Sequence, residues 1–76
     1  MKTKVRNRLK YWRHYLQIDT QTEYANLLQV EQWAVSRWER QQTQPSVETL
    51  YYVWKRLKPL IPDLHLEDLL EEVDGA

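Results

Sequence analysis

Cysteine is absent from this chain of 76 residues, and histidine occurs only twice, at positions far apart in the sequence. Disulfides and thiolate metal sites are therefore excluded, and two isolated imidazoles do not make a metal site. We expect no metal and no cofactor. The chain also has no apolar run of membrane-spanning length, and its basic start is not followed by the apolar stretch of a secretory signal. These patterns predict a soluble, cytoplasmic protein.

The residue groupings of an enzyme active site are missing as well. No nucleophile is paired with a base, and the carboxylates are mostly gathered toward the C-terminus, so we expect no enzymatic activity. A chain of 76 residues has room for one modest core. Four tryptophans and five tyrosines, together with leucine and valine, supply large apolar side chains for it. The sequence therefore predicts a single domain over residues 1–76.

Charge is balanced in total, with eleven basic and eleven acidic residues, but it is distributed asymmetrically between the two ends of the chain. The segment up to Leu16 contains bases and no acid, whereas the segment from Asp63 onward contains acids and no base. We expect a basic N-terminal arm over about residues 1–6, which attracts phosphate, and an acidic C-terminal tail over about residues 71–76, which repels it. The alternative interpretation is that both segments are merely solvated ends.

Apolar residues recur at helical spacing in five segments, and no segment alternates as a strand would. The first helix is expected over residues 5–16. A capping box from Thr20 to Glu23 begins a second helix that ends near Leu28, and a tight turn leads to a third helix that begins near Glu31. The second and third helices therefore form a helix-turn-helix.

Two further helices are expected in the second half of the chain. After a polar loop over residues 41–45, Ser46 is a candidate N-cap for a fourth helix that ends near Leu57. Pro59 and Pro62 interrupt the pattern, and a short amphipathic fifth helix follows, with its apolar stripe at Leu66, Leu69, Leu70 and Val73. The tryptophans expected in the core are Trp12, Trp38 and Trp54. The predicted fold class is all-α.

Three short blocks carry a family resemblance. They are Thr20-Gln21-x-Glu23-x-Ala25, then Val35-Ser36-Arg37-Trp38-Glu39-Arg40, then Gln44-Pro45-Ser46-Val47-Glu48-Thr49-Leu50. In this order and spacing they resemble the signature of Cro/repressor-type (XRE) regulators, over roughly residues 9–57. The resemblance implies a compact five-helix, lambda-repressor-like domain that binds a palindromic operator in double-stranded DNA as a homodimer, usually to repress transcription, in a prokaryotic, phage or plasmid setting.

The third helix is the expected recognition helix. If Val35 and Trp38 face the core, the opposite face carries the candidate base contacts, which are Gln32, Trp33, Ser36 and Arg37. Arginine can donate to guanine O6 and N7, glutamine can pair with adenine N6 and N7, and an apolar ring can pack against a thymine methyl. The alternative interpretation is an ordinary solvated helix face, with Trp33 packed against the chain or a partner subunit.

A second group of residues is expected to bind backbone phosphates without reading sequence. Gln21 resembles the family glutamine at the start of the second helix, where free amides also favour an anion. The other candidates follow the recognition helix or lie in the basic arm, and they are Arg40, Gln42, Thr43, Lys2, Lys4 and Arg6. Arg13 and Glu39 resemble the family pair that ties the first helix to the end of the third.

The sequence departs from the family pattern in three places. Gln29 stands where the turn usually has glycine, so a left-handed residue there costs about 1 kcal/mol unless the turn adopts another geometry. Glu31 replaces the usual small N-cap of the third helix, and its carboxylate is repelled by phosphate unless it accepts from cytosine N4. The segment over residues 58–64 is longer than the usual link between the last two helices.

Several functions remain open on the sequence alone. An antitoxin or a restriction-modification controller has the same fold. A protein-interaction module that does not bind DNA is supported by the zero net charge, by Glu31 and by Trp33. For a homodimer, we expect the interface at Leu60 and Ile61 together with the fifth helix, because the other helices are committed to DNA or to the core.

Overall fold

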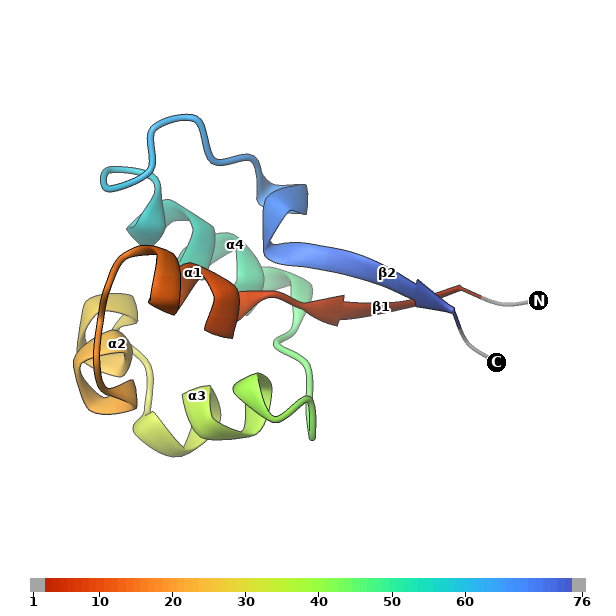
Figure 1. Ribbon diagram of the computed structural model, residues 1–76, viewed down its shortest axis with the longest axis horizontal. Coiled ribbons are helices and arrows are strands. Elements are labelled where there is room, and N and C mark those ends of the chain that lie inside the picture. Colours follow the sequence, from red (N-terminus) through yellow and green to blue (C-terminus); the bar gives the residue numbers. More distant parts are fainter. Residues whose placement is uncertain (1–2, 75–76) are drawn as a thin grey trace.

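The computed structural model describes residues 3–74, and within this range the chain forms four α-helices, one 3-10 helix and two strands (Figure 1). In chain order these elements are β1 (Thr3–Asn7), α1 (Leu9–Tyr15), α2 (Gln21–Leu28), α3 (Gln32–Glu39), α4 (Val47–Leu57), η1 (Leu66–Leu69) and β2 (Leu70–Asp74). The expectation of an all-α fold with five helices is therefore wrong. The fold is a mixed one, in which a helical body carries a two-stranded ribbon.

Side-chain caps begin two of the helices where the sequence predicts them. The hydroxyl of Thr20 accepts a hydrogen bond from the amide of Glu23 at 3.1 Å and begins α2. The hydroxyl of Ser46 likewise accepts from the amide of Thr49 at 3.1 Å and begins α4. The Glu23 carboxylate in turn accepts a hydrogen bond from the Thr20 hydroxyl at 3.1 Å. The side chains of the two capping-box residues are therefore in contact. Each cap satisfies an amide that the first helical turn leaves without an acceptor.

Three glutamines end helices in the left-handed conformation. Gln17, Gln29 and Gln41 all have φ of 59°. At the turn between α2 and α3, Gln29 takes the place of a glycine, and the amide of Val30 donates back to the carbonyl of Ala25 at 3.0 Å. This bond satisfies a helix-terminal carbonyl and offsets the cost of about 1 kcal/mol for a non-glycine residue in this region. The helix-turn-helix therefore keeps a tight turn without glycine.

The core lies between the four helices and is completed by the segment that follows α4. Tyr24 is fully buried, and its hydroxyl donates to the carbonyl of Leu9 at 2.8 Å, which fastens α2 to the start of α1. The indole N–H groups of Trp12 and Trp54 donate to the carbonyls of Asp68 and Leu64 at 2.8 and 2.9 Å. The buried apolar residues are Leu9, Tyr24, Ala25, Leu28, Val35, Trp38, Leu50, Val53, Leu57, Ile61, Leu64 and Leu69.

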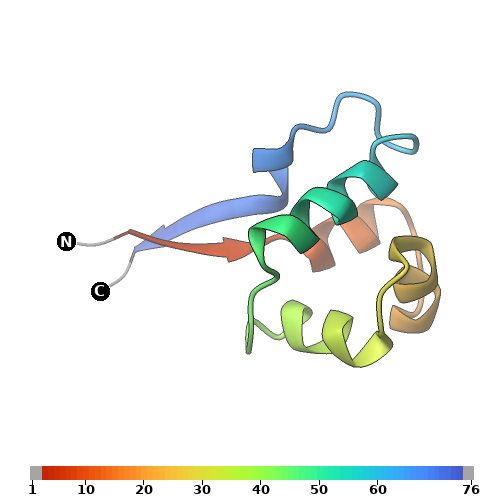
Figure 2. The ribbon, with the colours of Figure 1, turned by 180° about the vertical axis from the view of Figure 1, so that it is seen from behind.

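The two chain ends described by the structure pair as an antiparallel ribbon that leaves the helical body (Figures 1 and 2). We call β1 and β2 together the terminal ribbon. Its register places Arg6 opposite Glu71 and Val5 opposite Glu72, and the Arg6 guanidinium contacts the Glu71 carboxylate at 2.7 Å. The basic and acidic segments that we expected to be a separate arm and tail are therefore paired with each other over residues 3–7 and 70–74. Lys2 lies outside the described residues.

This pairing explains two wrong helix predictions. The first helix begins at Leu9 rather than Val5, because Val5 belongs to β1 and is 52% exposed. The expected fifth helix is replaced by η1 and β2. Continuing that helix would place Glu71 and Glu72 in its last turn, where the helix dipole disfavours negative charge, whereas strand pairing gives Glu71 an ion pair with a β1 side chain and satisfies the backbone.

The long segment after α4 closes the core. Ile61 and Leu64 are buried, with 8% and 1% exposure, and Leu69 is fully buried. The expected dimer interface at Leu60 and Ile61 is therefore not available as such, because only Leu60 is exposed, at 52%.

The burial of Tyr24 predicts a specific loss of stability in alkaline solution. Burial, with a smaller contribution from the charge of Glu39, raises the pKa of Tyr24 above its ordinary value. Above pH 10 the tyrosine of the unfolded chain ionises while the folded one stays protonated, so its contribution to the free energy of unfolding falls by about 1.4 kcal/mol per pH unit. Tyr24→Phe should remove this part of the pH dependence, at a cost of about 1 kcal/mol at neutral pH. Urea unfolding between pH 8 and 11 tests it, and parallel curves for the two proteins would contradict it.

Candidate nucleic-acid interface

Helix α3 is fixed to the body by a buried ion pair at its C-terminal end. Glu39 is 8% exposed, and its carboxylate accepts from Arg13 Nε at 2.7 Å and from a second guanidinium nitrogen at 3.1 Å. Arg13 also donates to the carbonyls of Ile18 and Asp19, both at 3.2 Å. The hydrogen bond to Glu39 raises the pKa of Arg13 above its ordinary value, against the opposing effect of burial. The pair that resembles the family tie between the first and third helices is thus formed.

Gln21 belongs to the same cluster. Its side-chain amide donates to Glu39 Oε1 at 3.0 Å, and the side chain is half-buried. The structure therefore places this expected phosphate contact at the first residue of α2, with its amide nitrogen directed to α3. The helix N-terminus beside it keeps the backbone geometry that suits an anion. One carboxylate consequently joins side chains from α1 and α2 to the end of α3.

The outward face of α3 carries the four expected base contacts. Val35 and Trp38 are buried, with 1% and 7% exposure, which turns the opposite side of the helix to solvent. Gln32, Trp33 and Arg37 are exposed, and Ser36 is half-buried beside them. The side chains thus lie on one face, as their spacing predicts. We call these four residues the α3 face.

Arg37 and Trp33 are in contact on this face. The Arg37 guanidinium carbon lies 5.5 Å from the centroid of the Trp33 ring, within the range of a cation–π interaction. Trp33 is 63% exposed. The indole therefore does not pack into the body, and it supports the guanidinium from the preceding helical turn. This contact orients the side chain that is best suited to bind guanine.

The loop after α3 carries the remaining expected phosphate contacts. Arg40, Gln42 and Thr43 are exposed. Arg40 Nε donates to the carbonyl of Ser36 at 3.3 Å, and the amide of Gln42 donates to the carbonyl of Arg37 at 2.9 Å. These bonds hold the first part of the loop against the end of α3. The three polar side chains therefore extend the α3 face beyond the helix.

A buried asparagine positions this loop, and sequence analysis missed it. Asn7 is 1% exposed, and its side-chain nitrogen donates to Gln44 Oε1 at 2.8 Å and to the carbonyl of Trp38 at 2.9 Å. Gln41 Nε2 donates in turn to the carbonyl of Asn7 at 3.0 Å. The last residue of β1 therefore ties together the end of α3 and both ends of the loop. Asn7 Oδ1 also accepts from the amide of Leu9 at 3.1 Å. The partners of Asn7 on α3 and the loop lie more than thirty positions away, so no local pattern indicates its role in holding the loop.

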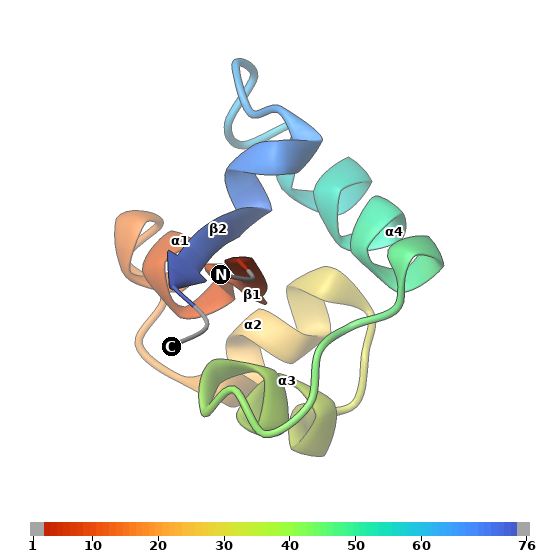
Figure 3. The ribbon, with the colours of Figure 1, turned by 90° about the vertical axis from the view of Figure 1, so that its right-hand side faces the viewer.

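Lys4 and Arg6, the two described residues of the expected basic arm that were candidate phosphate contacts, lie on β1. The terminal ribbon projects from the body in a direction away from helix α3 (Figures 1 and 3). Both side chains are exposed, but that of Arg6 contacts Glu71. The structure thus brings Gln32, Trp33, Ser36, Arg37, Arg40, Gln42 and Thr43 together and separates Lys4 and Arg6 from them.

The difference in burial between the two ion pairs predicts a difference in their effects on stability. Glu39→Gln leaves Arg13 buried without a charged partner, so the free energy of unfolding should fall by about 3 kcal/mol or more. Glu71→Gln removes an exposed pair, whose side chains are 47% and 39% accessible, and should cost about 1 kcal/mol or less. Urea unfolding of both variants tests this difference. Equal losses would mean that the buried pair does not hold α3.

The chemical groups of the α3 face determine what it can bind. The helix presents an amide, an indole, a hydroxyl and a guanidinium, and the loop that follows adds a second guanidinium and further polar side chains.

Within the described residues, no helix is long and apolar enough to cross a membrane, and no acidic, histidine or cysteine side chains gather as a metal site. No protein-family model matches the chain, and comparison with curated proteins and with solved structures finds no match either.

Proposed function

We propose that this protein binds double-stranded DNA in a sequence-specific manner and regulates transcription, with α3 in the major groove. The observation that carries the proposal is the way α3 is presented. Its apolar side and Glu39 are buried against α1 and α2, and its polar side is free over two helical turns. A helix held in this way at the end of a tight turn is the geometry by which helix-turn-helix proteins insert a recognition helix.

In this proposal the residues of the α3 face contact the bases. Arg37 is the principal reading residue, because a guanidinium donates two parallel hydrogen bonds to guanine and Trp33 already limits its orientation. Gln32 lies one helical turn earlier and is matched to adenine. Trp33 presents an exposed ring edge that suits a thymine methyl. The half-buried hydroxyl of Ser36 lies between them and serves either base type.

In this proposal the start of α2 and the loop after α3 bind the DNA phosphates. The N-terminus of α2, at Gln21, and the loop with Arg40, Gln42 and Thr43 provide the phosphate contacts. These contacts fix the register of the protein on the duplex without reading it. Because Glu39 is neutralised by Arg13, the basic side chains of α3 and the loop are not cancelled by the acid beside them.

A single recognition helix reads few base pairs, so tight and selective binding calls for two copies on a palindromic operator. The sign of regulation that the family resemblance suggests is repression. A restriction-modification controller or an antitoxin would use the same face, and the identity of the neighbouring gene distinguishes them. A protein-binding module is the second candidate, favoured by the 63% exposure of Trp33 and by the exposed carboxylate of Glu31.

Replacing the principal reading residue should relax specificity at one position of each half-site. Arg37→Ala should lose about 1–3 kcal/mol of preference for one base pair, with the fold unchanged because the residue is exposed. Selection of bound sequences from random duplexes, for the parent and for the variant, measures this preference. Lys10→Ala, a change at an exposed base of α1, is the matched control and should keep the parental motif. An unchanged motif for Arg37→Ala would show that the reading face is assigned wrongly.

Salt dependence should separate the loop from the terminal ribbon. Arg40→Ala should weaken binding to specific and non-specific duplexes alike, and it should lower the slope of log affinity against log salt by about 1. Arg6→Ala should leave the slope unchanged, because the Arg6 guanidinium contacts Glu71. A lower slope for Arg6→Ala would support the basic arm instead. A protein-binding module would show no steep loss of duplex affinity with salt in any variant.

A further inference from the structure

The outer side of α4 carries an exposed apolar face that neither the core nor the α3 face uses. Val47 is 80% exposed, Tyr52 is 57% exposed and Tyr51 is 43% exposed. Val47 and Tyr51 lie four residues apart, so they form one stripe along the helix. Valine at the first position of a helix contributes nothing to the core at that exposure. Adjoining apolar side chains left in solvent mark an interaction surface.

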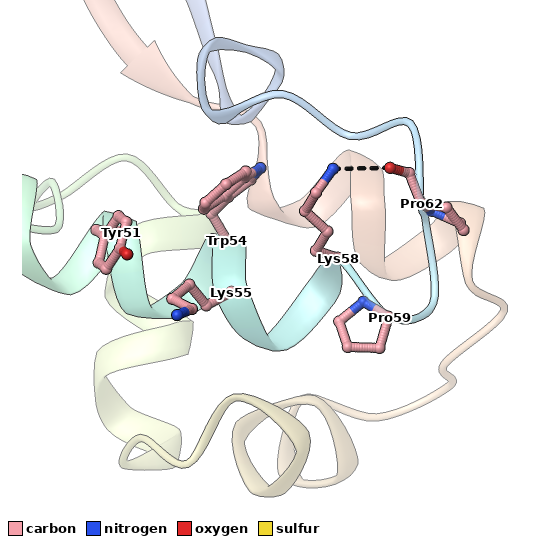
Figure 4. A pocket seen from close by; sticks show the side chains of 6 residues that line it. All are labelled: Tyr51, Trp54, Lys55, Lys58, Pro59 and Pro62. Atoms are coloured by element: carbon pink, nitrogen blue, oxygen red, sulfur yellow. Dashed lines mark hydrogen bonds between the residues drawn. The ribbon is translucent and has the colours of Figure 1, made fainter.

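An open groove of about 620 Å³ continues this stripe toward the C-terminal end of α4 (Figure 4). Its walls are formed by Tyr51, Trp54 and Lys55 of α4, by Lys58 at the C-cap, and by Pro59 and Pro62 of the segment that follows. The groove is held open by fixed contacts. Lys58 Nζ donates to the carbonyl of Pro62 at 2.7 Å, and the indole N–H of Trp54 donates to the carbonyl of Leu64 at 2.9 Å.

Charge is graded along the same helix. Glu48 is exposed near its N-terminal end, and the exposed bases Lys55 and Arg56 lie near its C-terminal end. Two such helices packed in parallel would bring like charges together. Packed antiparallel, each acidic end lies beside the basic end of the other helix, and the two helix dipoles also oppose each other favourably. The face is therefore complementary to itself about a two-fold axis.

We propose that a second copy of this chain occupies this face, with the two α4 helices antiparallel about a two-fold axis near Tyr51. Val47 of each copy then enters the groove of the other, because antiparallel packing centred on Tyr51 sets Val47, four positions before it, against Lys55, four positions after it. Glu48 of each copy pairs with Lys55 of the other. The Tyr51 rings meet at the axis, where an isologous contact repeats the same residue.

The dimer would place two recognition helices on one operator. This part of the argument rests on the proposed function, because it assumes that α3 binds DNA. Seen along the terminal ribbon, α3 lies at the lower edge of the domain and α4 at its side, on the opposite flank from α1 (Figure 3). A two-fold axis that runs vertically beside α4 in this view leaves both α3 helices at the same edge. Both recognition helices can then meet one side of a duplex.

The interface is small. An interface of standard size buries about 800 Å² per partner, which would be about a seventh of the 5426 Å² of accessible surface. The α4 stripe and its groove form only part of one side of the domain. The dimer is accordingly weak in free solution, and binding of two half-sites on one duplex raises the effective concentration of one copy for the other.

Charge reversal across the proposed pair provides the test. Glu48→Lys and Lys55→Glu should each raise the dimer dissociation constant at least about tenfold, measured by sedimentation equilibrium up to millimolar protein. An equimolar mixture of the two variants should recover dimers, because the hybrid restores both opposite-charge contacts. Val47→Ser should weaken the dimer, and Val47→Leu should keep it. Glu67→Lys reverses an exposed acid on η1 as the matched control and should behave as the parent.

Circular dichroism shows that each variant is folded, and binding to a duplex with one half-site is measured beside sedimentation. The proposal predicts that the charge-reversed variants keep half-site binding and lose only the gain from a second half-site. Absence of duplex binding in every protein, with the sedimentation results unchanged, would refute the proposed function and leave the interface standing. The proposed interface would be overturned if the unmodified protein stays monomeric, or if the mixture of the two charge-reversed variants recovers no dimer. Either result would mean that the groove binds another protein or has no partner.

Discussion

The buried pair between Arg13 and Glu39 is the contact on which the rest of the domain depends. It joins α1 to α3, and through the amide of Gln21 it also reaches α2. A buried charge costs free energy unless it is paired and its remaining hydrogen-bonding capacity is satisfied, and both carboxylate oxygens and the guanidinium of this pair have partners. The pair thus holds the end of α3 against the body, while Val35 and Trp38 bury the inner side of the helix and leave the α3 face in solvent.

The terminal ribbon pairs the basic end of the chain with the acidic end, whose charges cancel in the total. Bases at one end of the chain and acids at the other meet as opposed strands, in the register that sets Arg6 against Glu71. Two isolated strands are marginal in water, so the ribbon relies on its attachment to the body, where Asn7 binds the end of α3 and the loop that follows it. The same residue therefore ends the ribbon and positions the loop proposed to bind phosphate.

The α3 face and the exposed side of α4, for which we propose different partners, differ in chemistry. The α3 face is polar, and its one exposed ring supports the Arg37 guanidinium rather than an apolar cluster. The exposed side of α4, at Val47, Tyr51 and Tyr52, is aromatic and aliphatic, and the charges along it run from acidic to basic. Groups that read base edges must donate and accept hydrogen bonds, whereas a two-fold protein interface gains from apolar area with complementary charge at its rim. One small domain thus has a separate surface for each of the two proposed partners.

What the sequence by itself determined is the local structure of the helical body. Thr20 and Ser46 begin their helices by hydrogen bonds that reach three residues along the chain, and the spacing of Val35 and Trp38 fixes which side of α3 is buried. Only the tertiary structure decided the ribbon, the closing segment after α4 and the role of Asn7. The apolar pattern of residues 66–73 fits a helix as well as it fits η1 followed by a strand, and what selects the strand is a partner that lies 65 positions away. Such contacts have no local signature, because loop closure and packing, rather than propensity, decide between two conformations that the same residues allow.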